Sequence, residues 1–126
     1  MSNTMEGLKK TFKQTDTSLA KFRIVKLGTN ANEVIASTAV TDVMFGVTDE
    51  SADGVAGNPC GVITSGVAKV VIAGATTKGA YISATTAGAG VATTTNLNKY
   101  VGILLETTTA SNQVAQVLLC PGQMSV

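Results

Sequence analysis

The sequence has little charge, few aromatic side chains, and no histidine or tryptophan. Charged residues make up 13% of it, against roughly 25% in an average globular protein, and aromatic residues make up 4%. Histidine is the commonest metal ligand and the commonest general acid or base, so its absence excludes histidine metal sites and histidine-based catalysis. A net charge of only +1 argues against a chain that is disordered throughout.

The abundant residues are instead Thr, Ala, Val and Gly, arranged as short apolar runs between Gly-rich and Asn-rich turns. The 126 residues have the length of one domain. Short β-branched runs at regular spacing are typical of small barrels and sandwiches. The sequence therefore predicts an all-β fold, a small single-domain β-barrel or β-sandwich with short strands, plus an N-terminal arm. We expect strands at residues 22–27, 33–36, 41–48, 60–73, 80–83, 99–106 and 114–120.

Glycine and proline mark further details of these strands. Gly46 lies inside a strand and predicts a bulge or a close backbone approach. Residues 85–98 contain few large apolar side chains and predict a loop or a weakly packed ribbon. We expect Pro121 and Gly122 to end the last strand.

A weak internal repeat accompanies this pattern. Residues 45–47 with Glu50 resemble residues 101–103 with Glu106, and residues 67–73 resemble residues 114–120. This similarity suggests two related β units packed around one core.

The charge is distributed unevenly along the chain. Residues 1–26 hold six basic and two acidic residues, a net charge of +4, whereas residues 27–126 hold three basic and six acidic residues, a net charge of −3. Such asymmetry suggests that the basic segment meets a partner. Nucleic acid is not expected as that partner, because the rest of the chain has no basic patch and the N-terminal segment lacks interleaved aromatics.

We divide the chain into an N-terminal arm, residues 1–21, and a β-domain, residues 22–126. The apolar residues of the first segment fall at helical spacing and would form one stripe on a helix. These residues are Met5, Leu8, Phe12, Leu19 and Phe22. Two interpretations stay open: an arm that docks on a partner, and a short helix or terminus packed on its own domain.

Targeting signals and cysteines give little further information about function. The N-terminus lacks the apolar stretch of a signal peptide, and no window approaches the roughly 18 apolar residues of a membrane span, so we expect no membrane partner and synthesis in a cytoplasm. Cys60 and Cys120 are too sparse for a disulfide scaffold and are expected as small buried hydrophobic residues.

Candidates for catalysis are few. A Ser or Cys nucleophile normally needs an adjacent base, and Lys69 is expected on a solvated strand face. The acidic residues Asp49, Glu50 and Asp53 lie in one loop, but their spacing departs from that of a calcium-binding loop, and a solvated acidic loop is the simpler interpretation. The glycines at 88 and 90 precede no helical pattern, unlike a phosphate loop. We therefore predict no enzyme, no metal and no cofactor.

The order of several motifs resembles one family. They are the 45–50 run FGVTDE, the 66–70 run GVAKV, the 78–82 run KGAYI, the 100–106 run YVGILLE and the 114–119 run VAQVLL. Together they are similar to the small capsid decoration, or cement, proteins of tailed bacteriophages. The resemblance covers about residues 22–122.

This resemblance implies a protein of the capsid exterior, made in the host cytoplasm. It implies binding to the major capsid protein after head expansion, bridging of neighbouring copies, often as a homotrimer, and resistance to internal DNA pressure. The N-terminal segment lies outside the matching motifs. By inference we assign the capsid-binding arm to Leu8, Lys9, Lys10, Phe12 and Lys13.

Two alternatives remain open on the sequence. The Thr- and Gly-rich residues 85–98 suggest another phage structural subunit, of a tail tube, a baseplate or an adhesin. The acidic residues 49–53 suggest a small ligand-binding barrel.

Overall fold

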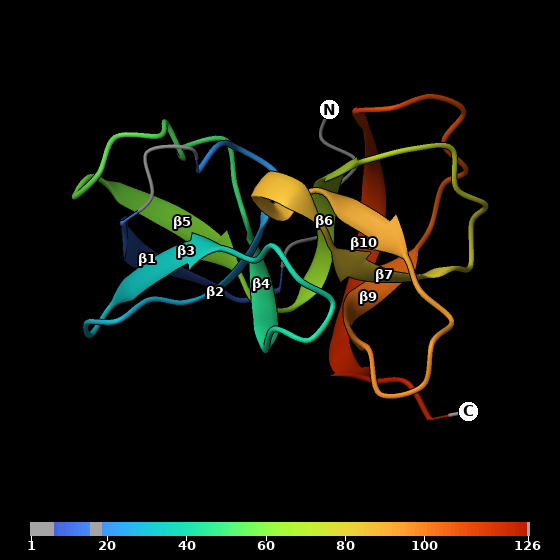
Figure 1. Cartoon of the computed structure of the whole chain (residues 1–126). Helices are drawn as coiled ribbons and strands as arrows, with labels where there is room; N and C mark the ends of the chain where they lie inside the picture. The colour runs from blue at the N-terminus through green and yellow to red at the C-terminus, as the bar shows by residue number, and fades with distance from the viewer. Residues whose placement is uncertain (1–6, 16–18, 126) are drawn as a thin grey trace.

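The fold is built almost entirely of β-strands (Figure 1). The structure, a computed structural model, describes residues 7–15 and 19–125. Its first five strands close one barrel in the order β1-β3-β2-β4-β5, and its last five close a second barrel in the order β10-β6-β8-β7-β9. The chain crosses from one barrel to the other at Thr64 and Ser65. The predicted all-β fold is confirmed, with two small barrels in one domain.

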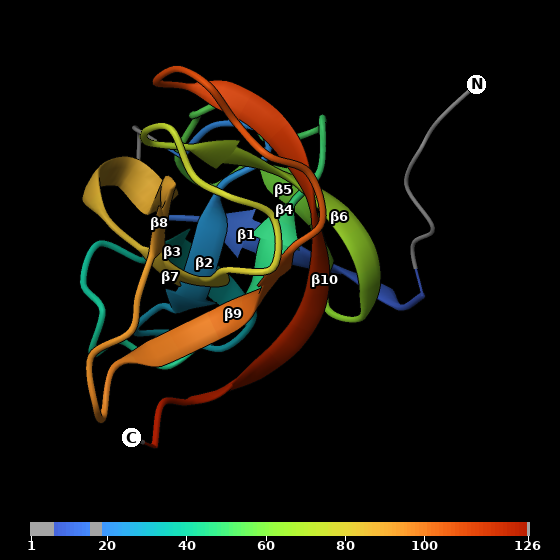
Figure 2. The ribbon, with the colours of Figure 1, turned by 90° about the vertical axis from the view of Figure 1, so that its right-hand side faces the viewer.

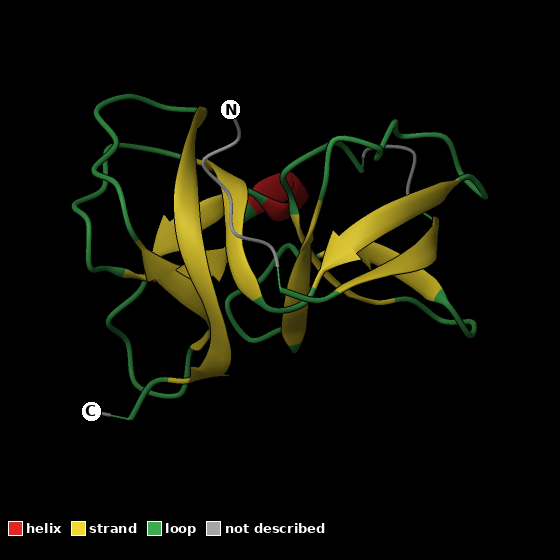
Figure 3. Ribbon diagram, turned by 180° about the vertical axis from the view of Figure 1, so that it is seen from behind, coloured by secondary structure: helices red, strands yellow, loops and turns green. Residues whose placement is uncertain are grey.

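Eight of the ten strands fall on the predicted runs, whereas β1 and β8 were not among the expected strands. The first barrel contains β1 (Lys9–Gln14), β2 (Ile24–Leu27), β3 (Glu33–Ala36), β4 (Met44–Thr48) and β5 (Pro59–Ile63). The second contains β6 (Gly66–Ile72), β7 (Tyr81–Ala84), β8 (Gly90–Ala92), β9 (Lys99–Leu104) and β10 (Gln113–Gln123), with a short 3-10 turn η1 (Thr86–Gly88) before β8. Seen from behind, the strands again form two groups on either side of this turn (Figure 3).

Two apolar cores hold the barrels together. The first barrel encloses Phe12, Leu19, Val25, Val34, Ala36, Ala52, Cys60 and Val62. The second core fills the second barrel and also includes Ile24, Met44, Val47 and Ile63 from the first. Because successive side chains of a strand point to opposite faces, Val25 faces its own barrel while Ile24 packs against the neighbouring one. This shared core joins the two barrels into one packed unit.

Gly46 marks both a bulge and a close approach, as predicted. Val25 pairs with Gly46 and Lys26 pairs with Met44, so Phe45 is an extra residue in β4. A Cβ atom on Gly46 would lie 2.7 Å from the carbonyl oxygen of Ile63. The position therefore requires glycine, and the bulge re-aims the side chain of Phe45.

The internal repeat does not correspond to the two barrels. Its members at residues 67–73 and 114–120 form β6 and β10, which pair antiparallel with each other inside the second barrel. Figure 2 shows these two strands along one side of that barrel. The two related units nevertheless pack around one core, as expected, because residues of β4, β6, β9 and β10 all belong to the second core.

The last strand continues beyond its predicted end. β10 runs through Pro121 and Gly122 to Gln123, with a register shift between Leu119 and Gly122 where it pairs with β9. A bulge tolerates proline, which has no N–H to donate to the ladder. Residues 85–98 are a weakly paired segment in which β8 pairs with β6 at one position only.

The N-terminal segment forms a strand and not a helix. β1 pairs antiparallel with β5 over five positions and parallel with β3 over two. The helical interpretation is wrong for Lys9–Gln14, because the edges of β3 and β5 supply backbone partners that local spacing does not reveal. Phe12 and Leu19 are both buried in the first barrel. Met5 lies outside the described residues.

Candidate functional site

The five residues predicted for the capsid-binding arm lie on or beside β1, and the strand divides them between two faces. Lys9 and Lys13 share one face of the strand, and Lys10 and Phe12 share the other. Phe12 is buried, whereas Leu8 and the three lysines are exposed. The structure thus brings the predicted residues together on one strand, with Phe12 as their anchor in the core.

Lys9 is tied to the domain itself. Its ammonium lies 3.0 Å from a carboxylate oxygen of Asp49, a buried residue at the start of the acidic loop. Burial alone raises the pKa of Asp49, but hydrogen bonds from Ser51 and the ion pair with Lys9 outweigh it and hold that pKa below its usual value. A Cβ atom on Gly61 would overlap this carboxylate, so glycine makes room for it. Lys9 therefore stabilises the fold at this point.

Gln14 is a residue of this strand that the sequence analysis missed. It is fully buried, its Nε2 donates to Asp53 at 3.0 Å, and its Oε1 accepts from the backbone N–H of Gly54 at 3.0 Å. Its backbone N–H also donates to the carbonyl of Asn58 at 2.9 Å. Reading the segment as a strand would have placed Gln14 on the inward face beside Phe12. Gln14 fastens the acidic loop to β1.

The acidic loop is solvated over most of its length, as expected, but its first acidic residue is not. Asp49 is buried and paired, and Asp53 accepts hydrogen bonds from Val55, Asn58 and Gln14, which lower its pKa. Glu50 and Asp53 are both exposed, whereas Asp49 is not. Within residues 7–15 and 19–125, no three Cys, Asp or Glu side chains gather in a metal-binding arrangement.

Leu8, Lys10 and Lys13 are the exposed part of the site. Leu8 is 69% exposed, while its backbone N–H donates to the Ser65 hydroxyl at 2.9 Å. Neither Lys10 nor Lys13 forms an ion pair with another residue of the described chain. The ammonium of Lys10 lies 5.2 Å from the centroid of the Phe12 ring. An apolar side chain and two uncompensated cations are thus presented on a strand of a closed barrel.

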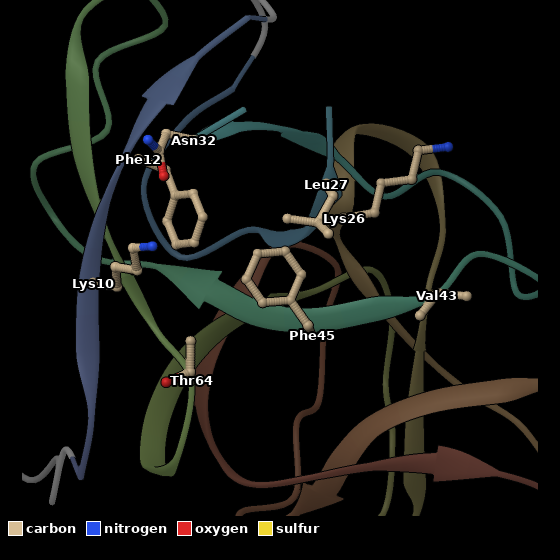
Figure 4. A pocket seen from close by; sticks show the side chains of 8 residues that line it. All are labelled: Lys10, Phe12, Lys26, Leu27, Asn32, Val43, Phe45 and Thr64. Atoms are coloured by element: carbon tan, nitrogen blue, oxygen red, sulfur yellow. The ribbon is translucent and has the colours of Figure 1, made fainter. Parts of the chain in front are cut away.

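An apolar pocket of about 670 Å³ opens beside this strand (Figure 4). The rings of Phe12 and Phe45 meet edge to face within it, with centroids 5.5 Å apart. The lining residues come from β1, from the β2–β3 hairpin, from β4 and from the residue after β5. They are Lys10, Phe12, Lys26, Leu27, Asn32, Val43, Phe45 and Thr64. Sequence analysis found only Lys10 and Phe12, because the others are brought in by separate segments.

The second barrel presents a different surface. Pairing register places Val67, Leu118, Ile103 and Tyr81 in one row across β6, β10, β9 and β7. Leu118 is 41% exposed and Tyr81 is 38% exposed, and the Tyr81 ring packs on Tyr100 with centroids 4.6 Å apart. We call these four residues the apolar row.

The two cysteines lie in different barrels and are both free thiols. Cys60 is buried in the first core, as predicted, and this burial together with the charges of Asp49 and Asp53 raises its pKa to about 11. Cys120 is only half-buried, and burial raises the pKa of its thiol as well. Neither thiol has the lowered pKa of a reactive cysteine.

Three further findings bear on what the chain is similar to and where it could act. The part of the chain that the structure describes contains no helix long and apolar enough to cross a membrane. No curated protein sequence is similar to the chain. Among solved structures, the head fiber gp8.5 N base in bacteriophage phi29 shares the fold, with a TM-score of 0.67 and 12% sequence identity, over 94% of this chain and 98% of that one.

The phage cement protein family matches residues 6–119. This match includes β1, which lay outside the motifs that carried the resemblance. The structural neighbour is also a phage head component by name. The chain therefore belongs to the phage cement protein family and is a structural protein of the phage virion.

Proposed function

We propose that this protein binds the outer surface of the expanded phage head and stabilises it by bridging neighbouring major capsid proteins. The observation that carries the proposal, beside family membership, is the surface of Leu8, Lys10 and Lys13 on β1. Two cations on one strand that form no ion pair with any described residue favour an acidic protein surface. Contacts repeated over many copies of a shell add avidity to a modest single contact.

In this proposal residues 1–21 act as a binding segment while part of them stays in the barrel. Pairing of β1 with β5 fixes the backbone of Lys10 and Lys13, so little backbone order has to be gained on binding. Lys9 supports the surface indirectly, through its ion pair with Asp49.

Charge reversal on β1 tests this surface better than truncation. Deletion of residues 1–20 would remove β1 and open the barrel, so a loss of binding would have two explanations. We expect a Lys10→Glu/Lys13→Glu variant to bind expanded heads that lack the protein about tenfold more weakly, since reversed charges repel an acidic surface. Occupancy is measured by quantitative gel analysis of purified decorated heads.

The matched control is Lys78→Glu/Lys99→Glu, which makes the same change in net charge on the second barrel. This variant should bind like the wild type. Equal occupancy for all three proteins would contradict the role of β1.

We further propose that the protein associates with itself as a homotrimer. The apolar row of the second barrel supports this, because exposed contiguous apolar side chains favour burial against a partner. A Leu118→Glu variant should associate at least tenfold more weakly in sedimentation equilibrium, with Leu97→Glu, also exposed in the second barrel, as the control. A wild-type protein that is monomeric at all concentrations and on heads would refute the trimer.

A second candidate is the base of a head fibre, which the name of the structural neighbour suggests. Electron microscopy of decorated heads separates the two functions. Compact density of one small domain per binding site supports the cement function, and long projections support the fibre function.

A further inference from the structure

We propose that the pocket between Phe12, Phe45 and Leu27 receives an apolar side chain of the shell protein that stands beside a carboxylate, and that Lys10 pairs with this carboxylate. The inference rests on the proposed function and names the chemistry of the partner segment that the first barrel recognises.

The pocket has the size and lining of a site for a large apolar side chain. Its volume of about 670 Å³ lies in the range of roughly 300–1,000 Å³ that is usual for ligand sites. The edge-to-face rings of Phe12 and Phe45 form its aromatic walls. Leu27 is 64% exposed and Val43 is 70% exposed at its margin. Covering these side chains would remove apolar surface from water, which favours association.

The pocket is held in shape by the backbone. The bulge in β4 sets the direction of Phe45, and five pairs with β5 fix the strand that carries Phe12. The backbone N–H of Lys13 donates to the carbonyl of Asn32 at 2.7 Å, which ties the β2–β3 turn to β1. A preformed site loses little conformational entropy on binding.

The charges around the pocket select an acidic partner. Its lining contains two lysines and no Asp or Glu. Lys26 points away from the rings, and its ammonium lies 3.2 Å from the Asp42 carboxylate. Lys10 points toward the Phe12 ring and has no ionic partner among the described residues. A cation that has no ion-pair partner in the described part of the chain therefore faces an apolar cavity, where an ion pair is screened less than in open water.

The isolated protein tests this chemistry without any shell. The probe is phenylacetate, which carries an aromatic ring and a carboxylate, and phenylacetamide is its neutral counterpart. We expect phenylacetate to cause saturable NMR shifts of the Leu27 and Val43 methyl groups and to bind at least threefold more tightly than phenylacetamide. In Lys10→Gln this preference should disappear while the ring still binds.

Three results would overturn the proposal: no saturable shift, equal binding of the two probes to the wild type, or a preference that survives in Lys10→Gln. A fourth would be the finding that the pocket is filled by a second copy of this chain, seen as concentration-dependent shifts of the same methyl groups without any probe.

A variant on heads separates this inference from the proposed function. Leu27→Glu places a like charge at the pocket margin and should reduce head occupancy at least tenfold, whereas Leu97→Glu, at a similarly exposed position of the second barrel, should not. Wild-type melting temperatures would show that both variants fold. If Lys10→Glu/Lys13→Glu binds weakly but Leu27→Glu binds like the wild type, the pocket inference falls and the proposed function stands. If Lys10→Glu/Lys13→Glu and Leu27→Glu both bind like the wild type, the pocket inference and the proposed function are both wrong.

Discussion

The two barrels have the same number of strands but very different surfaces. Residues 1–65 hold 13 of the 17 charged residues of the chain, and residues 66–126 hold four. The first barrel carries the lysines of β1, the acidic loop and the pocket, whereas the second carries the apolar row. Charge favours selective contact with an oppositely charged surface, and apolar area favours close packing. The difference suggests one barrel for recognition of the shell and one for packing between copies.

The cores of the two barrels also differ in their dependence on polar and charged groups. The second core is entirely aliphatic, and its strands β6 and β10 pair over seven positions. Each barrel has one weak closure, two pairs between β1 and β3 in the first and one pair between β6 and β8 in the second, but the first also depends on the buried amide of Gln14 and the Lys9–Asp49 ion pair. The second barrel should therefore tolerate a change in pH or charge better than the first, and the first should tolerate a change in packing better than the second.

The largest effect is expected from Gly102→Ala in the second barrel. A Cβ atom there would overlap the carbonyl oxygen of Leu118 on the paired strand β10. Relief requires a shift of the backbone, so we expect a loss of about 3 kcal/mol in the free energy of unfolding. Chemical denaturation measures it. Gly74→Ala is the control, since a Cβ atom on Gly74 would meet no atom within 4 Å. A Gly102→Ala variant as stable as the wild type would show that β9 and β10 can move apart at this point without loss of stability.

Gln14→Ala should have a smaller effect, confined to the first barrel. It removes the hydrogen bonds that the buried amide of Gln14 makes with the backbone N–H of Gly54 and the exposed Asp53 carboxylate, and since water can reach both groups we expect a smaller loss of stability than for Gly102→Ala. Hydrogen exchange should become faster at residues 50–58 and stay unchanged in β6 and β10. Equal acceleration in both barrels would mean that they unfold as one unit and do not differ in local stability.

The Lys9–Asp49 ion pair gives the first barrel a pH dependence. Because the pKa of Asp49 is lowered in the folded state, its contribution to stability is present above the unfolded pKa of about 3.9 and is lost as pH falls through the lower folded value. Asp49→Asn should be about 1 kcal/mol less stable than the wild type at pH 7. The difference should shrink below pH 4. A constant difference from pH 7 to pH 2 would contradict a charged Asp49 as its source.

The cysteines offer the mildest comparison, because modification of half-buried Cys120 should scarcely change the fold. In the native protein at pH 8, iodoacetamide should modify half-buried Cys120 at least tenfold faster than buried Cys60, whose thiol has a pKa of about 11. Peptide mass spectrometry over time gives both rates. Faster modification of Cys60 would indicate that the first barrel opens more readily than the second.

The local sequence pattern predicted most of the strands, because β-branched runs bounded by Gly and Asn favour the extended conformation by themselves. It also predicted the Gly46 bulge, the burial of Cys60 and the family. It failed where a distant partner decided the outcome. Lys9–Gln14 became a strand because β3 and β5 offered it free edges, and β10 passed Pro121 because a bulge absorbed the missing donor.

The sequence by itself determined an all-β domain with a basic N-terminal segment, because composition, turns and charge are properties of neighbouring residues, and the order of its motifs carried the resemblance to the phage cement family. Only the tertiary structure decided that this segment closes a barrel, that Lys9 is bound to Asp49 while Lys10 has no ionic partner among the described residues, and that Phe12 and Phe45 share a pocket. These facts depend on register between strands far apart in the chain, and register is set when a core forms and backbone edges pair.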